Sequence, residues 1–323
     1  MAVITIREAL KQAMREEMQR DERVFLLGED IAAYGGAYAV TKGLVEEFGE
    51  ERVRDTPISE GIIVGAAMGA AVGGQRPVAE LMTINFALLA MDQLINHAAK
   101  MHYMFGGQWN VPMVVRTAAG WGQLSATHSQ TLEVFFAHVP GLKVIFPGTP
   151  YDSKGLLKAA IRDADPVVFI EHTALYGVKG EVPDGDYVLP IGKSDIKREG
   201  QHCTIATYGR MLQVSLEAAT TLAADGIEVE IVDLRTLRPL DMAPVYESVQ
   251  KTNHAVVVTE EWVSFGVGAE VAARIAHDSF DDLDAPVGRV GSLEVPMPYA
   301  KNLEQAVLPW PKNVIEAVKA TLA

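Results

Sequence analysis

Apolar residues recur along this chain at two alternating spacings. Between residues 6 and 18 they fall at helical intervals, and the short apolar run VFLLGED (24–30) that follows is typical of a buried strand. The same alternation continues: strands are predicted at 76–83, 111–118, 143–147 and 166–171, and helices at 87–104, 129–138 and 151–163. Strands that alternate with helices predict a parallel sheet covered by helices on both faces.

Residues 172–200 interrupt this rhythm, because they are rich in Gly and Pro and contain no long apolar run. A second alternating series follows, with strands predicted at 203–209, 227–234, 255–261 and 288–295 and a helix at 211–226. The sequence therefore predicts an α/β protein of two doubly wound domains. The first spans residues 1–185, the connection spans 186–200, and the second domain spans 201–323.

Composition narrows the class of partner. The chain has 323 residues and a net charge of −14, which argues against nucleic acid or an anionic membrane as a partner. The single cysteine, Cys203, excludes an internal disulfide and lies in an apolar strand pattern. The uncharged stretch Gly61 to Gln75 is shorter than the ~20 residues that span a membrane, and the N-terminus has no signal-peptide pattern. We expect a soluble cytoplasmic protein.

The segment DTPISE (55–60) places a carboxylate, Glu60, directly before an apolar run. Glycines follow at positions 61, 65, 69 and 73, and this spacing of four places them along one helix face. Each costs a helix about 1 kcal/mol relative to Ala, so we expect the face to approach another backbone closely, as between subunits. Glu60 is either a partner of the helix dipole or a working carboxylate in a buried interface.

Many blocks of the chain resemble one family, in order, from about Glu8 to the C-terminus. They include DTPISE, RPVAELMTINF, MDQLINHAAK, THSQ, KGLLKAAIRDADPVVF, IVDLRTLRPLD, KTNHAVVVTEEW and VPMPYAKNLE. The family is the beta subunit of the thiamine-diphosphate-dependent first component of 2-oxo acid dehydrogenase complexes. ELMTINF resembles the pyruvate dehydrogenase type more than the branched-chain type. The resemblance implies a transketolase-like pyrimidine-binding domain followed by a transketolase C-terminal-like domain.

The resemblance implies roles for three residues at the cofactor. The glutamate at the position of Glu60 hydrogen-bonds a ring nitrogen of the aminopyrimidine, which favours the imino tautomer that removes the thiazolium proton. Absence of competing water would strengthen that bond. Phe86 matches an aromatic residue stacked on the pyrimidine, and Ile58 is expected to pack beside the cofactor. Without the resemblance, Phe86 would be read as core packing.

His128, in SATHSQ, lies in a loop before a helix that Ser129 is expected to cap. A lone loop histidine is usually a polar surface residue. The resemblance instead implies a histidine at the active-site entrance that handles the 2-oxo acid carboxylate and acyl transfer to the lipoyl group. Imidazole suits both tasks because its charge changes near neutral pH. Trp121 and Leu124 depart from the family's loop, which leaves the identity of the acid open.

AAIRDADP resembles a segment whose backbone carbonyls, together with one from the VPM strand (111–113), hold a potassium ion. The matching positions are Met113, Ala160, Ile161, Asp163 and Asp165. Without the resemblance, these residues would be read as an ordinary helix end followed by a strand.

Thiamine diphosphate also needs a magnesium site, which in this cofactor class is a GDG motif followed by an Asn. The sequence contains no GDG, and DGD at 184–186 lies in the Pro/Gly connection. The resemblance therefore implies an alpha subunit that holds magnesium and the diphosphate, in an alpha-two beta-two heterotetramer. It also implies docking to a dihydrolipoyl acyltransferase core.

Other functions compete with this interpretation. A nicotinamide-binding enzyme is one, because SFGVGAEV contains part of a dinucleotide-binding loop, although it lacks the third glycine. A metal hydrolase is another, but His97 and His102 are five positions apart and do not lie on one helix face, as a zinc pair requires. A protein that serves only assembly, the C-terminal half of a split transketolase, and an acetoin or branched-chain 2-oxo acid dehydrogenase beta subunit also remain open.

Overall fold

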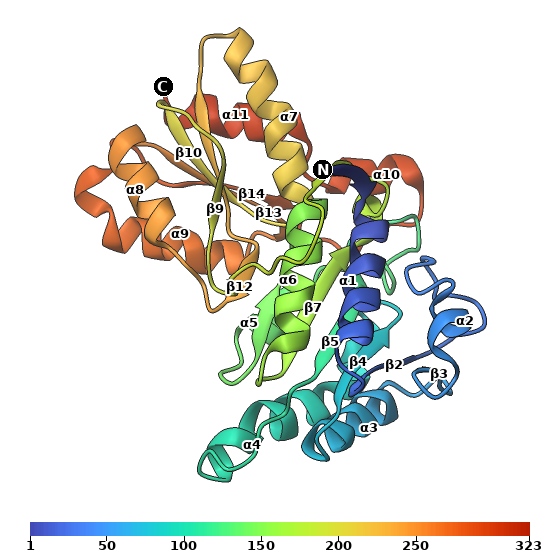
Figure 1. Ribbon diagram of the computed structural model, residues 1–323. Helices are drawn as coiled ribbons and strands as arrows, with labels where there is room; N and C mark the ends of the chain where they lie inside the picture. The colour runs from blue at the N-terminus through green and yellow to red at the C-terminus, as the bar shows by residue number, and fades with distance from the viewer. The chain divides into compact units, whose positions relative to one another are not determined.

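The computed structural model describes residues 1–323 and divides the chain into two compact units (Figure 1). The first unit comprises Met1–Gly120 and Phe135–Ile191, and the second comprises Trp121–Val134 and Gly192–Ala323. The segment 121–134, which carries His128, thus belongs with the C-terminal half of the chain. The chain passes from the first unit to the second for the last time between Ile191 and Gly192, which lies within the connection predicted at 186–200.

The first unit is built on parallel strands in the order β6-β7-β5-β4-β2-β3. A separate antiparallel pair joins β1 to β8. The strands are β1 (Ala2–Thr5), β2 (Val24–Gly28), β3 (Val53–Asp55), β4 (Arg76–Leu81), β5 (Val114–Ala119), β6 (Lys143–Ile145), β7 (Val167–His172) and β8 (Lys179–Val182). The helices are α1 (Ile6–Arg20), α2 (Leu44–Phe48), α3 (Glu60–Val72), η1 (Phe86–Ala90), η2 (Asp92–Ala98), α4 (Ala99–Met104), α5 (Glu133–Ala137), α6 (Pro150–Arg162) and η3 (Thr173–Leu175), and α5 begins in the second unit.

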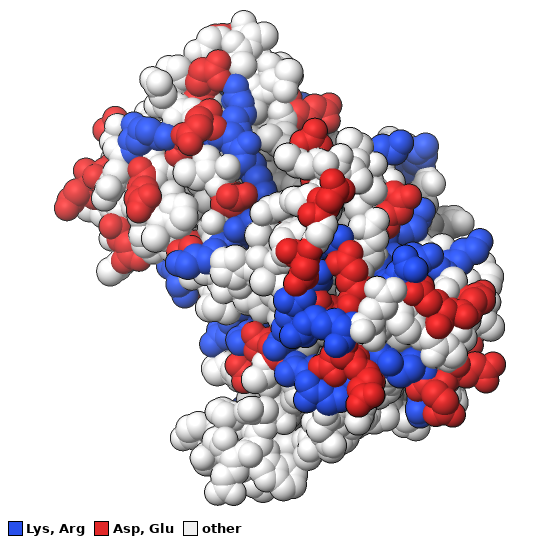
Figure 2. Space-filling view, viewed as in Figure 1, with Lys and Arg blue, Asp and Glu red and all other residues white.

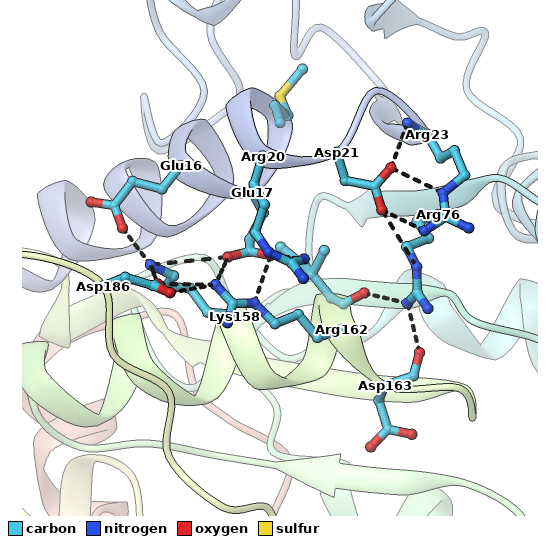
Figure 3. Close-up of polar contacts among 12 residues, drawn as sticks. Glu16, Glu17, Arg20, Asp21, Arg23, Arg76, Lys158, Arg162, Asp163 and Asp186 are labelled. Carbon is cyan, nitrogen blue, oxygen red and sulfur yellow. Dashed lines mark hydrogen bonds and ion pairs between the residues drawn. The ribbon is translucent and has the colours of Figure 1, made fainter.

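Helix α1 shows how sequence pattern becomes packing in this unit. Thr5 and Glu8 form a capping box at its start, and Leu10 and Met14 on its apolar face are fully buried. That face lies against α6, and both helices cover the sheet (Figure 1). Their polar edges are joined by ion pairs in which the buried Lys158 contacts Glu16, and Arg162 contacts Glu17. Asp186, from the segment after β8, is exposed and contacts Lys158 (Figure 3).

The second unit contains a smaller sheet in the order β14-β13-β10-β11-β9, in which only β9 runs antiparallel. Its strands are β9 (Asp195–Arg198), β10 (Cys203–Thr207), β11 (Val229–Asp233), β12 (Thr236–Arg238), β13 (Ala255–Trp262) and β14 (Gly288–Ser292). Its helices are α7 (Arg210–Ala224), α8 (Ala243–Thr252), α9 (Val267–Asp278), η4 (Phe280–Asp282), α10 (Lys301–Val307) and α11 (Pro311–Thr321). Cys203 is buried in β10, as its apolar context predicts.

The predicted alternation of strands and helices is confirmed in both units, with three corrections. The helix predicted at 87–104 is three consecutive segments, a 3-10 helix, a π-helix and a short α-helix. The helix predicted at 129–138 is confined to Glu133–Ala137, so Ser129 does not cap it. Residues 172–200 contain the short strands β8 and β9, which were not predicted because neither forms an apolar run. No helix has the length and apolar content that crossing a membrane requires.

Candidate active site

Glu60 is the first residue of α3, and the extended residue Ser59 precedes it without a side-chain capping bond. Only 6% of Glu60 is exposed, and no hydrogen bond within the chain reaches its carboxylate. The helix dipole favours a negative charge at this position but leaves the lone pairs of the carboxylate unsatisfied. Glu60 is therefore a buried acceptor available to a donor from outside this chain.

Glu60 has carboxylate neighbours at the edge where the parallel strands end. Glu29 follows β2 directly, and its pKa is raised by burial and by the negative charges of Asp30 and Glu60. Asp55 ends β3, and its carboxylate accepts the backbone N–H groups of Ala32 and Ala33 at 2.7 and 3.2 Å. In open α/β sheets ligands bind outside the carboxyl ends of the strands, which is where these groups lie.

Unpaired polar atoms lie on the segments that pack against α3. Asn85 donates to the Thr83 hydroxyl at 3.0 Å, but its own Oδ1 is buried without a hydrogen-bond partner. Gln93 Oε1 is likewise buried and unpaired, and the Gln93 side chain lies against Gly61. Buried acceptors normally have partners, so the site has unmet capacity for hydrogen-bond donors.

Phe86 and Ile58 flank this region differently. Phe86 begins η1, which contacts α3, and its ring is partly buried. Ile58 is 73% exposed, and Ile62, Leu88 and Leu89 beside it are also exposed apolar side chains. The end of the unit that carries α4 shows no charged side chain in Figure 2, and Tyr103 there is 88% exposed. An apolar surface this extensive is typical of an interaction site.

The glycine face of α3 is open in this chain at Gly65 and Gly69. A Cβ added at Gly69 would meet no atom within 4 Å, and one at Gly65 would touch only the Gln93 side chain. The close backbone approach that the glycine spacing predicts is made within this chain only at Gly61, where an added Cβ would lie 3.3 Å from the Leu89 carbonyl oxygen of η1. A contact with another subunit stays a prediction.

His128 lies in the loop that belongs to the second unit, whereas Glu60 lies in the first. Its backbone N–H donates to the Ser125 carbonyl at 3.2 Å, and its Nδ1 lies 2.9 Å from the Thr127 hydroxyl. Ser129, expected to cap a helix, instead accepts the Leu124 N–H through its hydroxyl at 3.3 Å. The loop is thus folded on itself around His128.

Four of the five predicted potassium positions lie at or just after the C-terminal end of α6, and Met113 directly precedes β5. The Met113 carbonyl accepts the Val167 N–H at 3.0 Å, and the Ala160 carbonyl accepts the Asp163 N–H at 3.2 Å. The Ile161 and Asp163 carbonyls both accept from Arg76 Nη1, at 2.8 and 2.9 Å (Figure 3). Lys143 pairs with the carboxylates of Asp163 and Asp165. Each carbonyl retains a second lone pair, but two of them already face a guanidinium cation.

One acidic cluster in the second unit was missed by sequence reasoning. Burial and the charge of Glu261 raise the pKa of Glu133 to about 8, and Tyr208 donates to Glu133 at 2.9 Å. Glu133 had been read as an ordinary position of a predicted helix, and no local signal marks it as buried. The contact with Tyr208, 75 positions away, decides its environment.

Comparison with known proteins shows the family to which the two halves of the chain belong. Residues 2–179 match the family Transketolase, pyrimidine binding domain, and residues 192–314 match Transketolase, C-terminal domain. The pyruvate dehydrogenase E1 component subunit beta of Rhizobium meliloti is 51% identical over 322 residues, which cover 99% of this chain and 70% of that protein. The corresponding mitochondrial subunit of Bos taurus is 50% identical over 325 residues, which cover 99% of this chain and 90% of that protein.

The chain belongs to the pyruvate dehydrogenase E1 beta-subunit family. The resemblance to the pyruvate dehydrogenase type is therefore confirmed, and so is the fold of two transketolase-like domains. Among solved structures, a split gene transketolase, an inactive beta4 tetramer, matches with a TM-score of 0.80 and 26% identity, over 99% of this chain and 98% of that one. Within the E1 beta family, Glu60 and Phe86 fall in the pyrimidine-binding segment.

Proposed function

We propose that this chain is the beta subunit of a thiamine-diphosphate-dependent pyruvate dehydrogenase. In it, the chain supplies the pyrimidine half of the cofactor site for oxidative decarboxylation of pyruvate and reductive acylation of a lipoyl group. The observation that carries the proposal is Glu60, which is buried at the start of α3 and receives no hydrogen bond from its own chain. Membership of a pyrimidine-binding family says which kind of donor would satisfy it.

The residues present fit one end of the cofactor. Glu60 would accept a hydrogen bond from, or share a proton with, a ring nitrogen, and its burial would strengthen that interaction. Phe86 and Ile58 would supply apolar contact beside the ring. Thiamine diphosphate, when bound, supplies the nucleophilic carbon that attacks a 2-oxo acid. The part of this chain is to bind the pyrimidine, to hold or release a proton at Glu60, and to exclude water.

His128 is proposed to meet the carboxylate of the 2-oxo acid and to assist acyl transfer. Its imidazole Nδ1 is oriented by the Thr127 hydroxyl, so one ring nitrogen is occupied within the loop. A histidine can donate when charged and accept when neutral, which suits both steps near neutral pH.

The magnesium and diphosphate end of the cofactor is proposed to come from an alpha subunit, in an alpha-two beta-two heterotetramer. One acidic residue of the DGD segment supports this division, because it is engaged elsewhere. Asp186 pairs with Lys158 and Arg162 (Figure 3). Docking to a dihydrolipoyl acyltransferase core is a further part of this proposal.

The competing functions have weaker support. The glycines of SFGVGAEV begin α9, but the Glu261 carboxylate accepts the Gly268 N–H at 2.7 Å, where a dinucleotide phosphate would bind. The split transketolase match has 26% identity, about half that of the E1 beta relatives. Acetoin and branched-chain 2-oxo acids are alternatives for the substrate, and an assembly-only role is separated from catalysis by experiment.

The substrate is tested on the chain co-purified with its native alpha partner. Reduction of an artificial electron acceptor is followed with thiamine diphosphate and magnesium, offering pyruvate, a branched 2-oxo acid and acetoin in parallel. We expect cofactor-dependent turnover with pyruvate, and none from this chain alone. Preference for acetoin or the branched acid would replace the substrate assignment. No turnover with any of them would overturn the dehydrogenase proposal.

Potassium at the carbonyls of Met113, Ala160, Ile161, Asp163 and Asp165 also stays a proposal. The oxygens are of the right kind, but Arg76 already supplies a positive charge to two of them. Melting temperatures in potassium chloride and in tetramethylammonium chloride at equal ionic strength test it. We expect a higher melting temperature in potassium chloride. Identical melting temperatures in the two salts would contradict the proposed potassium site.

We also propose a cytoplasmic location for this chain, whereas several relatives carry "mitochondrial" in their names. Fractionation of the native cell tests it.

A further inference from the structure

The loop that carries His128 begins at a side chain clamped inside the second unit. Arg210 packs against two neighbouring tryptophans, with its guanidinium carbon 5.4 Å from the centre of the Trp121 ring and 4.6 Å from that of Trp310. The two rings meet edge to face at 5.9 Å. A guanidinium over an indole face is the most favourable cation–π geometry, and here it occurs twice on one buried cation.

The position of Arg210 is not explained by its own helix. Arg210 is the first residue of α7, where a positive charge is disfavoured by the helix dipole. Arg210 is 5% exposed and its guanidinium donates to Glu260 of β13 at 2.8 Å, so this carboxylate compensates its charge. The guanidinium carbon of this fixed cation lies over the rings of both tryptophans. Trp310 is itself held, because its Nε1–H donates to the Gln305 carbonyl at 2.7 Å.

A second attachment follows two residues after Trp121. The Gln123 N–H donates to Glu304 Oε1 at 2.9 Å, across 181 positions of sequence. Glu304 is fully buried on α10, and its other oxygen has no hydrogen-bond partner. Gln123 and Ser125 have φ angles of 58° and 68°, a conformation that non-glycine residues rarely adopt. Such a backbone persists only where surrounding contacts hold it.

Hydrogen bonds within the loop link the residues held by Arg210 and Glu304 to the turn that contains His128. Leu124 donates its N–H to the Ser129 hydroxyl, and the His128 N–H donates to the Ser125 carbonyl. Fixing residues 121–125 therefore fixes the turn in which His128 lies. The far end of the loop is held by the bond from Tyr208 to Glu133.

We propose that Arg210, by clamping Trp121 against Trp310, is a positioning residue that fixes the His128 loop on the C-terminal unit. The proposal rests on the catalytic role proposed for His128. It also gives a reason for Trp121, which departs from the family's loop.

The test uses the full chain in its co-purified assembly, with four variants. Trp121→Leu removes the ring, Trp121→Phe keeps an aromatic face, and Arg210→Met removes the cation. Arg274→Met, in an exposed pair with Glu270, is the control. Hydrogen exchange of peptides from residues 121–134 is expected to accelerate roughly tenfold in Trp121→Leu and Arg210→Met, and much less in Trp121→Phe and the control. Unchanged exchange in Trp121→Leu would overturn the proposal, even if Arg210→Met misfolds.

Activity then separates positioning from general loss of structure. Trp121→Leu is expected to lower kcat/KM roughly tenfold in the wild-type background and less than about twofold in a His128→Ala background. Equal losses in both backgrounds, or full activity of His128→Ala, would overturn positioning through His128. If the proposed function is wrong, the assembly will show no thiamine-dependent turnover. Hydrogen exchange of residues 121–134 would then still test whether Arg210 and Trp121 fix the loop.

Discussion

The buried carboxylates of this chain differ in what surrounds them. In the first unit, Arg116 is bidentate to Glu171, at 2.6 and 2.9 Å, and also donates to Glu80 at 2.7 Å. Tyr176 completes that network with a bond to Glu171 at 2.8 Å. Glu60 has no such cation or donor. The first group is satisfied within the fold, so its role is structural, whereas Glu60 awaits a donor from outside the chain.

Removing Arg116 should be costly for this reason. Arg116→Met leaves Glu80 and Glu171 facing each other in a buried site without their cation. We expect the free energy of unfolding to fall by about 3–5 kcal/mol, measured by urea denaturation. Arg274→Met, which breaks only an exposed pair on α9, should cost less than ~0.5 kcal/mol. Similar losses in the two variants would contradict the distinction drawn between the buried network and a surface pair.

Glu133 makes stability depend on pH in a defined direction. Burial and the nearby charge of Glu261 raise its pKa from 4.5 to about 8. Between these values the folded chain retains a proton that the unfolded chain has released, so the free energy of unfolding falls as pH rises. Glu133→Gln keeps the acceptor for Tyr208 and removes the titration. The variant should therefore gain on the wild type by roughly 1 kcal/mol or more between about pH 5.5 and about pH 8.

Urea denaturation of both proteins at the two pH values measures this. If the difference between variant and wild type is the same at both, Glu133 does not retain its proton in the folded chain.

At the scale of elements, most helices and strands could be predicted because periodicity reports burial. Helix α1 is an example, since its apolar spacing and its Thr5–Glu8 cap are both local. The segment 87–104 was harder, because the spacing that predicts an α-helix does not reveal the i→i+5 bonding of η2. Strand β8 pairs with β1 across nearly 180 positions, and nothing local marks it as a strand.

The candidate site also has some features that the local sequence predicts and others that depend on distant residues. Glu60 and its helix start are local features and were predicted, but their chemistry came from family resemblance. The fixing of the His128 loop depends on Arg210 and Glu304, which are distant in sequence. Residue types in a short window cannot report such contacts.

Two helix glycines give a matched test of the open face of α3. A Cβ at Gly69 would meet nothing within 4 Å, whereas one at Gly155 in α6 would lie 2.6 Å from the Leu189 side chain. Gly69→Ala should stabilise the isolated chain by up to ~1 kcal/mol, and Gly155→Ala should destabilise it. If the face packs on another subunit, Gly69→Ala should also weaken co-purification with the alpha partner. Unaltered assembly would indicate that this face is not a close subunit contact.

At the scale of the whole molecule, the chain has the character of one part of a shared enzyme. One unit presents Glu60 beside unpaired buried acceptors and exposed apolar side chains, and the other carries His128 on a fixed loop. In its only DGD segment, Asp186 is engaged in ion pairs with Lys158 and Arg162. A chain of this kind is expected to bind one end of thiamine diphosphate and to require a partner for the other.

The most direct test of this account is the rate of pyruvate-dependent acceptor reduction by the co-purified assembly with Glu60 replaced by Gln. Gln preserves the size of the side chain, but its amide cannot give a proton to the pyrimidine or take one from it. The account predicts that Glu60→Gln assembles with the alpha partner like the wild type, as judged by gel filtration, while its rate falls at least about a hundredfold. An intact assembly that turns over pyruvate at the wild-type rate would contradict the central claim that Glu60 is the catalytic carboxylate of this chain.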